Sequence, residues 1–373
     1  MDHKPGLLVF SHLRWNFVYQ RPQHLISRFS NQYNVLYIEE AVYNKEDDGF
    51  YAQREEGITI VVPHLNDQIN NGTNERLTSI INTVITAFDI EDYLLWYYTP
   101  MALEFTRHLY PELIIYDCMD QLSAFKNAPT NLLILERELL DSSSIVFTGG
   151  RSLFNEKKQM HANIHCFPSS IDASHFSQAR QRQMDPPDQS KIPFPRFGFF
   201  GVIDEIFDIE LLDEIAQEKP EWHFVLIGPV VKIDEQNLPR RANIHYLGMK
   251  KYAELPSYIS GWNVAVLPFA LNEATRYISP TKTPEYLAAG KPVISTAVED
   301  VIDPYGTMGL VSIAHNVDEF IAYGKHELET DNAERDNIRD EFLKEQSWDL
   351  TWEAINNEII KCLTKQKTLK TYV

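Results

Sequence analysis

The sequence predicts an α/β protein built from two doubly wound parallel-sheet domains. Short runs rich in β-branched and aromatic residues alternate with amphipathic stretches of roughly 10–15 residues, which is the pattern of βαβ units. The chain has 373 residues, and at roughly 100–200 residues per domain this length suits two domains or one large barrel. The proline-rich segment Gln181–Pro195 interrupts the alternation near mid-chain, which favours two domains joined by a linker over an eight-fold barrel.

We expect a first domain over residues 1–180, a linker over 181–195, a second domain over 196–345 and a C-terminal helix over 346–373. The predicted strands of the first domain are Leu7–Phe10, Val35–Ile38, Ile58–Val62, Tyr93–Tyr97, Leu113–Tyr116, Ser144–Phe147 and Ile164–Phe167. Its predicted helices are Arg21–Ser30, Asn74–Phe88, Met101–Leu109, Asn131–Leu140 and Ser152–Met160.

The same alternation resumes after the linker. The predicted strands are Phe197–Phe200, His223–Ile227, Ile244–Leu247, Val264–Pro268, Val293–Ser295 and Leu310–Ile313. The predicted helices are Ile209–Glu218, Tyr252–Ile259, Thr281–Ala289 and Val317–Glu327. The stretch Asn332–Cys362 is predicted to be helical throughout, with Trp348 and Trp352 on one face. In such an arrangement ligands bind beyond the carboxyl ends of the strands, so the loops that follow strands are the places to search.

The composition is that of an ordinary globular protein with a strong negative charge. The sequence carries 34 Lys and Arg against 53 Asp and Glu, a formal net charge of −19, and this field would repel a nucleic-acid backbone. Its three cysteines lie far apart with no C-x-x-C pair, which favours a reduced, cytoplasmic setting. The N-terminus lacks the pattern of a signal peptide, and the apolar run Val264–Leu271 is too short to span a membrane.

The loop after the first predicted strand is dense in hydrogen-bonding side chains. Arg14, Arg21 and His24 would lie at the mouth of the sheet, near the start of the helix that follows. Such a position suits an anion or the hydroxyl groups of a sugar. In the alternative, the arginines pair with neighbouring carboxylates and His24 packs at a domain edge.

Two aspartates follow the predicted strand Leu113–Tyr116. A carboxylate at the carboxyl end of a strand can act as a general base or bind a hydroxyl group, and both Asp117 and Asp120 are candidates. In the alternative, each caps a helix or braces the loop.

The strongest local signal is NEATRYISPTKTPEYLAAG over Asn272–Gly290. Ser279 is predicted to be the N-cap of a helix that Gly290 terminates. The amides of Thr281 and Lys282, with the lysine charge, would then form a site for a diphosphate. Glu285 stands one turn further on, where its carboxylate could accept hydrogen bonds from vicinal hydroxyls such as those of a ribose. In the alternative, this is a capped core helix with an ion pair between Lys282 and Glu285.

Other ligand-binding motifs are weak or absent. Gly248 and the tyrosines near it could hold a base through backbone hydrogen bonds and stacking. The sequence has no G-x-G-x-x-G or G-x-x-x-x-G-K-[ST] fingerprint, which disfavours a dinucleotide or P-loop site. It also has no Cys/His cluster or helical histidine pair, so we expect no metal site.

Seven segments give the chain a resemblance to a known family. They are FSHLRWNFVYQRPQHL, YDCMDQLSAF, FTGGRSLF and FPSSID, then FGFFGVID, SPTKTPEYLAAGKPVIST and the tryptophan-bearing C-terminal helix. Nearly the whole chain resembles the GT-B glycosyltransferases, in the bacterial family-1/4-like branch that assembles capsule- and teichuronic-type cell-surface polysaccharides. The resemblance implies two Rossmann-like domains facing across a cleft, with the nucleotide-sugar donor held mainly by the second. It also implies a last helix that crosses back to the N-terminal domain, and no catalytic metal.

The resemblance also implies roles for individual residues. Glu285 would bind the donor ribose, while Ser279, Thr281 and Lys282 would surround the diphosphate and Gly201 would lie near it. Two positions depart from the family pattern: Tyr277 replaces a frequent glutamate, and Ile206 lies where a basic residue is common. Compensation would come from Arg276 or from an arginine of the first domain.

The function implied is transfer of a sugar from a nucleoside diphosphate sugar, a UDP- or GDP-sugar, to a glycan or a lipid-linked acceptor. Lys282 and Arg276 would stabilise the leaving diphosphate, without a metal ion. Asp120 would be the general base of an inverting enzyme, or a positioning residue in a retaining one. The expected location is the cytoplasm, with peripheral association at the inner face of the plasma membrane as a further expectation. Two alternatives are a UDP-GlcNAc 2-epimerase-like enzyme of the same fold and a non-catalytic homologue that only binds sugar nucleotides.

Overall fold

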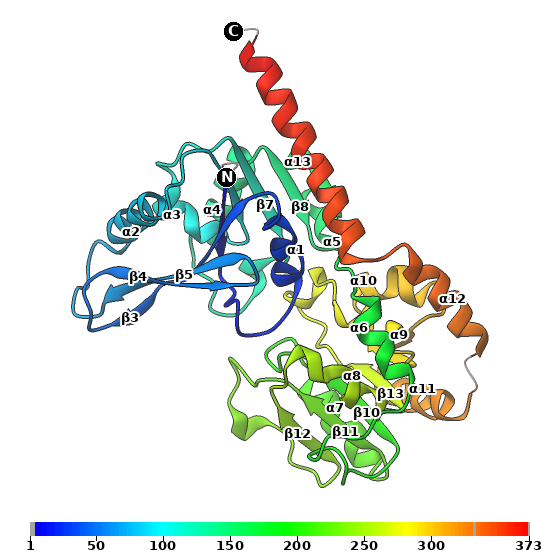
Figure 1. The fold of residues 1–373 in the computed structure, drawn as a ribbon. Coiled ribbons are helices and arrows are strands. Elements are labelled where there is room, and N and C mark those ends of the chain that lie inside the picture. The colour runs from blue at the N-terminus through cyan, green and yellow to red at the C-terminus, as the bar shows by residue number, and fades with distance from the viewer. Residues whose placement is uncertain (1–3, 331–332, 372–373) are drawn as a thin grey trace. The chain divides into compact units, whose positions relative to one another are not determined.

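A computed structural model describes residues 4–330 and 333–371 and divides into two compact α/β units. Unit 1 comprises Met1–Pro168 and Thr351–Val373, and unit 2 comprises Ser169–Leu350 (Figure 1). Each unit has a largely parallel sheet with helices in the connections, so the predicted doubly wound class is confirmed. The chain changes unit after Pro168 and again after Leu350.

The sheet of unit 1 has the strand order β3-β5-β2-β1-β6-β7-β8-β9, with β4 paired to β5. Its strands are β1 (Gly6–Ser11), β2 (Asn34–Glu39), β3 (Val42–Asn44), β4 (Gly49–Glu55), β5 (Ile58–Asn66), β6 (Tyr93–Tyr97), β7 (Leu113–Cys118), β8 (Ile145–Thr148) and β9 (Ile164–Cys166). β1 is buried along its whole length between β2 and β6, which explains why it reads as a continuous apolar run.

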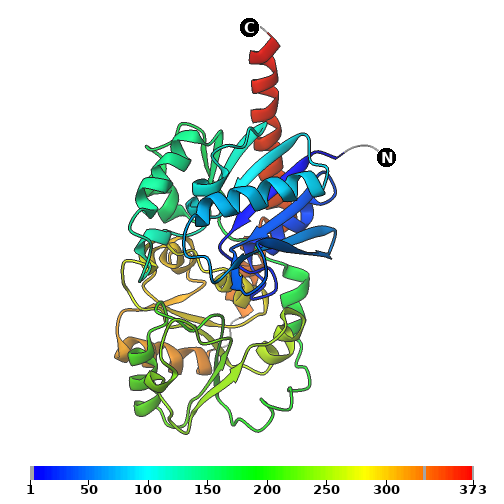
Figure 2. The same ribbon diagram turned by 90° about the vertical axis from the view of Figure 1, so that its left-hand side faces the viewer.

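The helices of unit 1 lie in the connections between its strands. They are α1 (Arg21–Phe29), α2 (Thr73–Ala87), α3 (Leu103–Thr106), α4 (Leu132–Ser142) and α5 (Arg151–Lys157). The last helix, α13 (Trp348–Thr371), follows all the strands and belongs to unit 1 from Thr351 on. Figure 2 shows α2 crossing one face of the sheet. Helix α13 packs on unit 1: the Trp352 and Phe29 rings lie 5.9 Å apart, and Gln366 donates to the Ser144 hydroxyl at 3.3 Å. The predicted return of the last helix to the N-terminal domain is therefore confirmed.

Strands β3 and β4 have no counterpart in the predicted elements. β4 pairs antiparallel with β5 across a two-residue turn in which Glu56 and Gly57 have φ values of 48° and 86°. Two positive φ angles are the signature of a type I′ hairpin turn, which joins strands of matching twist. Because most of β4 is exposed, its sequence shows no apolar alternation from which a strand could be predicted.

The sheet of unit 2 is parallel, in the order β12-β11-β10-β13-β14-β15. Its strands are β10 (Arg196–Phe200), β11 (His223–Ile227), β12 (Ile244–Gly248), β13 (Val264–Leu267), β14 (Val293–Thr296) and β15 (Ser312–Ala314). Its helices are α6 (Ala173–Ser177), α7 (Ile209–Glu218), α8 (Leu255–Ser260), α9 (Lys282–Ala288), α10 (Glu299–Val301), α11 (Val317–Glu329) and α12 (Ala333–Lys344). The strand order reverses at β10, between β11 and β13, which is where ligands bind in open α/β sheets.

The C-terminal stretch is two helices rather than the single one predicted. Helix α12 ends at Lys344 and α13 begins at Trp348, after a break in which the Ser347 hydroxyl accepts a hydrogen bond from the Leu350 amide at 3.1 Å. Ser347 thus caps α13, a signal that apolar periodicity alone does not register. Asn332, where the predicted helix begins, lies outside the described residues.

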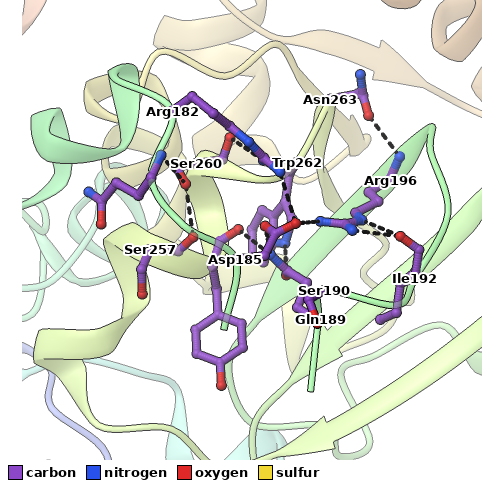
Figure 3. Close-up of polar contacts among 12 residues, drawn as sticks. Arg182, Asp185, Gln189, Ser190, Ile192, Arg196, Ser257, Ser260, Trp262 and Asn263 are labelled. Atoms are coloured by element: carbon purple, nitrogen blue, oxygen red, sulfur yellow. Dashed lines mark hydrogen bonds and ion pairs between the residues drawn. The ribbon is translucent and has the colours of Figure 1, made fainter. Parts of the chain in front are cut away.

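The predicted linker Gln181–Pro195 is part of unit 2 (Figure 3). The Gln189 side chain is fully buried, donating to the Tyr258 carbonyl and accepting from the Trp262 indole, both at 3.0 Å. Asp185 forms an ion pair of 2.9 Å with Arg196, the first residue of β10. The four prolines mark an irregular segment correctly, but Asp185 fixes it to β10 and Gln189 fixes it to Tyr258 of α8 and to Trp262.

No helix among the described residues is both long and apolar enough to cross a membrane.

Asp185 should matter far more to stability than its exposed partner. The Arg196 guanidinium is 1% exposed, so Asp185→Ala would leave a buried charge without its carboxylate and should cost about 3 kcal/mol of unfolding free energy. Arg182→Ala removes the other, half-exposed partner of Asp185 and should cost less than about 1 kcal/mol. Urea denaturation of both variants measures the difference; equal and small losses would show that the segment is only loosely attached.

Candidate functional site

Three neighbouring strands of unit 2 have a glycine at their carboxyl ends: Gly201 and Gly228 directly follow β10 and β11, and Gly248 is the last residue of β12. The Gly201 amide donates to the Ile227 carbonyl at 2.8 Å, and the Gly228 amide donates to the Gly248 carbonyl at 3.0 Å. Gly228 has φ of 143°, and a Cβ there would lie 1.8 Å from the Gly201 carbonyl oxygen. Only glycine permits this approach, so the carboxyl edge of β10, β11 and β12 is a surface of bare backbone.

Helix α9 is held at this edge by a buried tyrosine. The Tyr286 hydroxyl accepts a hydrogen bond from the Phe200 amide at 2.9 Å, and its ring packs edge-on against the Phe200 ring at 5.1 Å. Gly290 ends the helix with φ of 74°, and the Lys291 amide bonds the Tyr286 carbonyl at 3.0 Å. This is the Schellman termination that the glycine predicts.

The start of α9 differs from the prediction. The helix begins at Lys282 with Thr281 as N-cap, and Thr281 makes no side-chain capping bond. Ser279 lies two residues before that cap, so its predicted role as the N-cap is wrong. Thr281 makes no capping bond because it has helical dihedrals, whereas a capping side chain acts from an extended residue.

The Lys282 side chain lies across Gly201. A Cβ at Gly201 would come within 2.2 Å of Lys282 Cε and 3.1 Å of its Nζ. The lysine ammonium therefore sits at the end of β10, next to bare backbone. The sequence predicted this pairing of Gly201 with Lys282 only through the family resemblance, because the two are 81 residues apart.

Glu285 is a buried carboxyl group with an unsatisfied oxygen. The residue is 5% exposed, and its Oε2 has no hydrogen-bond partner among the described residues. Burial raises the pKa of Glu285 to about 8, against the opposing charge of Lys282. An orphaned buried carboxyl group is costly to the fold, and such groups cluster at functional sites. The Thr283 hydroxyl, two residues earlier in α9, is likewise buried without a partner in the described chain.

The two departures from the family pattern have different surroundings. Ile206 packs against the hydrophobic core of unit 2 rather than presenting a polar group. Arg276 and Tyr277 lie in a short turn before α9, where the exposed Arg276 guanidinium stands 5.2 Å from the Tyr277 ring. Arg276 is therefore accessible to a ligand on unit 2.

Arg21 and Asp117 brace unit 1. Arg21 donates to both oxygens of Asp117, at 2.9 and 3.1 Å, and to the Phe167 carbonyl at 2.7 Å. Both side chains are buried, and this pair ties α1 to the ends of β7 and β9. His24 is buried against the Tyr19 ring, and Arg14 pairs with Glu39 at 2.9 Å. For Arg14, Arg21 and His24 these contacts are those of the alternative in which arginine pairs with carboxylate and histidine packs, and Asp117 is the partner of Arg21. A role of these four residues in binding a ligand stays a prediction.

Asp120 is half-exposed in the loop that follows β7. Its carbonyl accepts from the Leu122 amide at 3.1 Å and from the Cys118 thiol at 3.5 Å, which fixes the backbone. The next side chain, Gln121, donates to Glu136, which is buried in an ion pair with Lys157 at 2.8 Å. The role of Asp120 as a base stays a prediction.

Residues 4–330 and 333–371 contain no group of three or more His, Cys, Asp or Glu side chains placed to hold a metal ion.

The sequence of unit 2 matches a known family. Residues 197–326 match the model of the family described as "Glycosyl transferases group 1". Unit 2 carries a group 1 glycosyl transferase domain. The match begins in β10 and runs into α11, so it encloses Gly201, Lys282 and Glu285.

One curated relative resembles the chain beyond chance. The protein named "Putative teichuronic acid biosynthesis glycosyltransferase TuaH", from Bacillus subtilis, is 27% identical over 222 residues. This match covers 54% of the chain and 55% of the relative, so it spans about half the length of each.

Solved structures with a similar fold cover nearly the whole chain. Sucrose-phosphate synthase from Thermosynechococcus elongatus has a TM-score of 0.70 at 13% identity, covering 97% of this chain and all of its own. The OtsA apo structure has a TM-score of 0.69 at 12% identity, covering 95% of this chain and 99% of its own. These similarities, together with the two sheets of the chain, establish the GT-B fold that contains the group 1 domain.

Because of Glu285 in the group 1 domain, the free energy of unfolding of the ligand-free protein should fall as the pH rises. Folded Glu285 keeps its proton up to about pH 8, whereas the ordinary value of 4.5 applies after unfolding. The folded state therefore binds more protons between these values, and the free energy of unfolding should fall there by up to ~1.4 kcal/mol per pH unit. Glu285→Gln should remove this loss and melt at a higher temperature than the wild type at pH 8, but not at pH 4.

Urea unfolding at several pH values, with the exposed Glu273→Gln as the control, measures this effect. Parallel pH profiles for the wild type and Glu285→Gln would contradict it.

Proposed function

We propose that this chain is a glycosyltransferase whose group 1 domain binds a nucleoside diphosphate sugar. The observation that supports this most is the buried Glu285 carboxyl group with its unsatisfied oxygen, one turn from a Lys282 that lies across Gly201. A donor has two features that would complete this arrangement. Its ribose hydroxyls can donate to Glu285, and its diphosphate can accept from Lys282.

The remaining donor contacts follow from the same edge of the sheet. Ser279 and Thr281, both half-buried, stand in the segment that leads into α9 and would surround the diphosphate. A Cβ at Gly248 would meet no atom of the described chain within 4 Å, so backbone there is open to a base. The base is proposed to be uracil or guanine, in a UDP- or GDP-sugar that acts as a co-substrate.

The reaction proposed is sugar transfer to a glycan or a lipid-linked acceptor. Negative charge builds on the diphosphate as the glycosidic bond breaks, and Lys282 with Arg276 would stabilise it. Asp120 would take the acceptor proton if the configuration inverts, or only position the acceptor if it is retained. We propose that the reaction takes place in the cytoplasm, with an acceptor that can lie at the inner face of the plasma membrane.

The comparisons favour transfer over the alternatives. The family model and the Bacillus relative are both described as glycosyl transferases, and a neighbour from E. coli with a TM-score of 0.68 is described as bound with UDP-2-fluoro glucose. Product analysis with the donor alone tests the choice: a transferase should hydrolyse the donor slowly and form no epimer. Formation of the 2-epimer from UDP-GlcNAc would replace this proposal with an epimerase.

Substitutions of Lys282 and Glu285 should change different kinetic constants. Lys282→Ala removes a charge-assisted contact worth ~1.5–3 kcal/mol that strengthens as the leaving group gains charge, so kcat and kcat/KM should both fall about 10- to 150-fold. Glu285→Gln weakens a ribose contact that is the same in ground and transition states, so the main effect should be a raised KM. Steady-state kinetics measure both.

The exposed Lys325→Ala and Glu273→Gln are the matched controls and should behave as the wild type. Normal kinetics in Lys282→Ala and Glu285→Gln would remove α9 from the active site.

Turnover should not require a divalent cation. Lys282 and Arg276 are proposed to supply the positive charge that a metal ion provides in other transferases, so activity should persist in excess EDTA. A complete loss that manganese restores would overturn the assignment of this role to the two side chains.

A further inference from the structure

The loop that leaves β10 lacks a cation. Gly201–Glu210 contains four acidic residues and no Lys or Arg, and Ile206 packs on the core. The diphosphate of the proposed donor carries two negative charges and gains a third when the sugar leaves, whereas Lys282 and Arg276 supply two positive charges. Because the inference below concerns that same ligand, it rests on the proposed function.

Hydrogen bonds hold the loop that follows β11 beside the loop that follows β10. Ile203 and Val230 form an isolated parallel bridge, in which the Ile203 amide donates to the Pro229 carbonyl at 2.9 Å and the Val231 amide donates to the Ile203 carbonyl at 3.1 Å. These bonds hold the start of one loop alongside the start of the other. Lys232 follows directly, with φ of 61° and an exposed side chain.

Asp204 directly follows Ile203 of this bridge and lies in the electrostatic field of two lysines. It is 9% exposed, and its carboxylate accepts a hydrogen bond from the Ile206 amide at 3.1 Å. Burial raises the pKa of Asp204, while the charges of Lys232 and Lys282 both oppose that rise. Its carboxylate is therefore within electrostatic range of a lysine from the β11 loop and of the lysine that lies across Gly201.

We propose that Lys232 is a further cation of the diphosphate site, and that Asp204 is the counter-ion of Lys232 and Lys282 when no ligand is bound. The positive charge missing from the β10 loop is supplied by the neighbouring loop, which the Ile203–Val230 bridge brings into reach. A bound diphosphate then takes both ammonium groups as partners and is repelled by Asp204.

If this proposal holds, removing the charge of Lys232 and removing the charge of Asp204 should have opposite effects on the affinity for a nucleoside diphosphate. Lys232→Gln keeps most of the side-chain length but removes an attraction, so it should weaken binding of a nucleoside diphosphate about tenfold, the equivalent of one charge-assisted contact. Asp204→Asn keeps an acceptor for the Ile206 amide but removes a repulsion, so it should tighten binding of the same ligand. Binding of the nucleoside without phosphates should not change in either variant.

Isothermal titration of the full chain with UDP, UMP and uridine, and with GDP, GMP and guanosine, measures these effects. Lys232→Arg should restore diphosphate affinity, because it restores the charge. Glu235→Gln, an exposed charge change three residues along the same loop, is the matched control and should bind as the wild type. Thermal melts of each variant show that it is folded.

The outcomes separate the two proposals. If the wild type binds UDP or GDP and Lys232→Gln binds it equally well, Lys232 is not part of the site and this inference fails alone. If Asp204→Asn weakens diphosphate binding, the counter-ion role is wrong. If the wild type binds no nucleotide of either series, the proposed donor site fails and this inference fails with it.

Discussion

The hydrogen bond from the Phe200 amide to the Tyr286 hydroxyl is the contact on which the candidate site depends. It joins the last residue of β10 to the middle of α9, inside the core of unit 2. From this anchor Lys282 reaches across Gly201, and Glu285 is held in an apolar environment. The close approach of Gly228 to Gly201 then leaves that edge of the sheet as bare backbone, against which a ligand can pack.

The carboxyl edge of β10 and β11 carries lysines, whereas the chain as a whole is strongly negative. The protein has a net charge of −19, yet the positive charges of Lys232 and Lys282 both act on one buried aspartate, Asp204. Glu285 adds a carboxyl group that burial keeps protonated near neutral pH. Both features cost folding free energy in the absence of a ligand, which is the usual trade between stability and a preorganised site.

The polar residues of unit 1 show that a pattern of residue types does not distinguish a ligand-binding residue from one that packs inside the fold. Arg21, His24 and Asp117 are predicted to follow strands, as binding residues in α/β folds do, but the structure places them in α1 and β7 and packs them inside the unit. The guanidinium of Arg21 fits the Asp117 carboxylate in a two-point contact, and the same geometry would fit a ligand. Sequence cannot separate the two uses, because the partner of Arg21 lies 96 residues away.

The sequence by itself determined the features that rest on local periodicity: two doubly wound sheets, most strand positions, the Gly290 termination of α9 and the placement of Lys282 and Glu285 on one helix. These depend on residues a few positions apart, so the pattern carries the geometry. Only the tertiary structure decided the rest. The attachment of Gln181–Pro195 to unit 2, the β4 strand and the bridge between Ile203 and Val230 all depend on contacts between distant segments. Such contacts are selected by packing and burial across the whole fold, and no local pattern of residues encodes them.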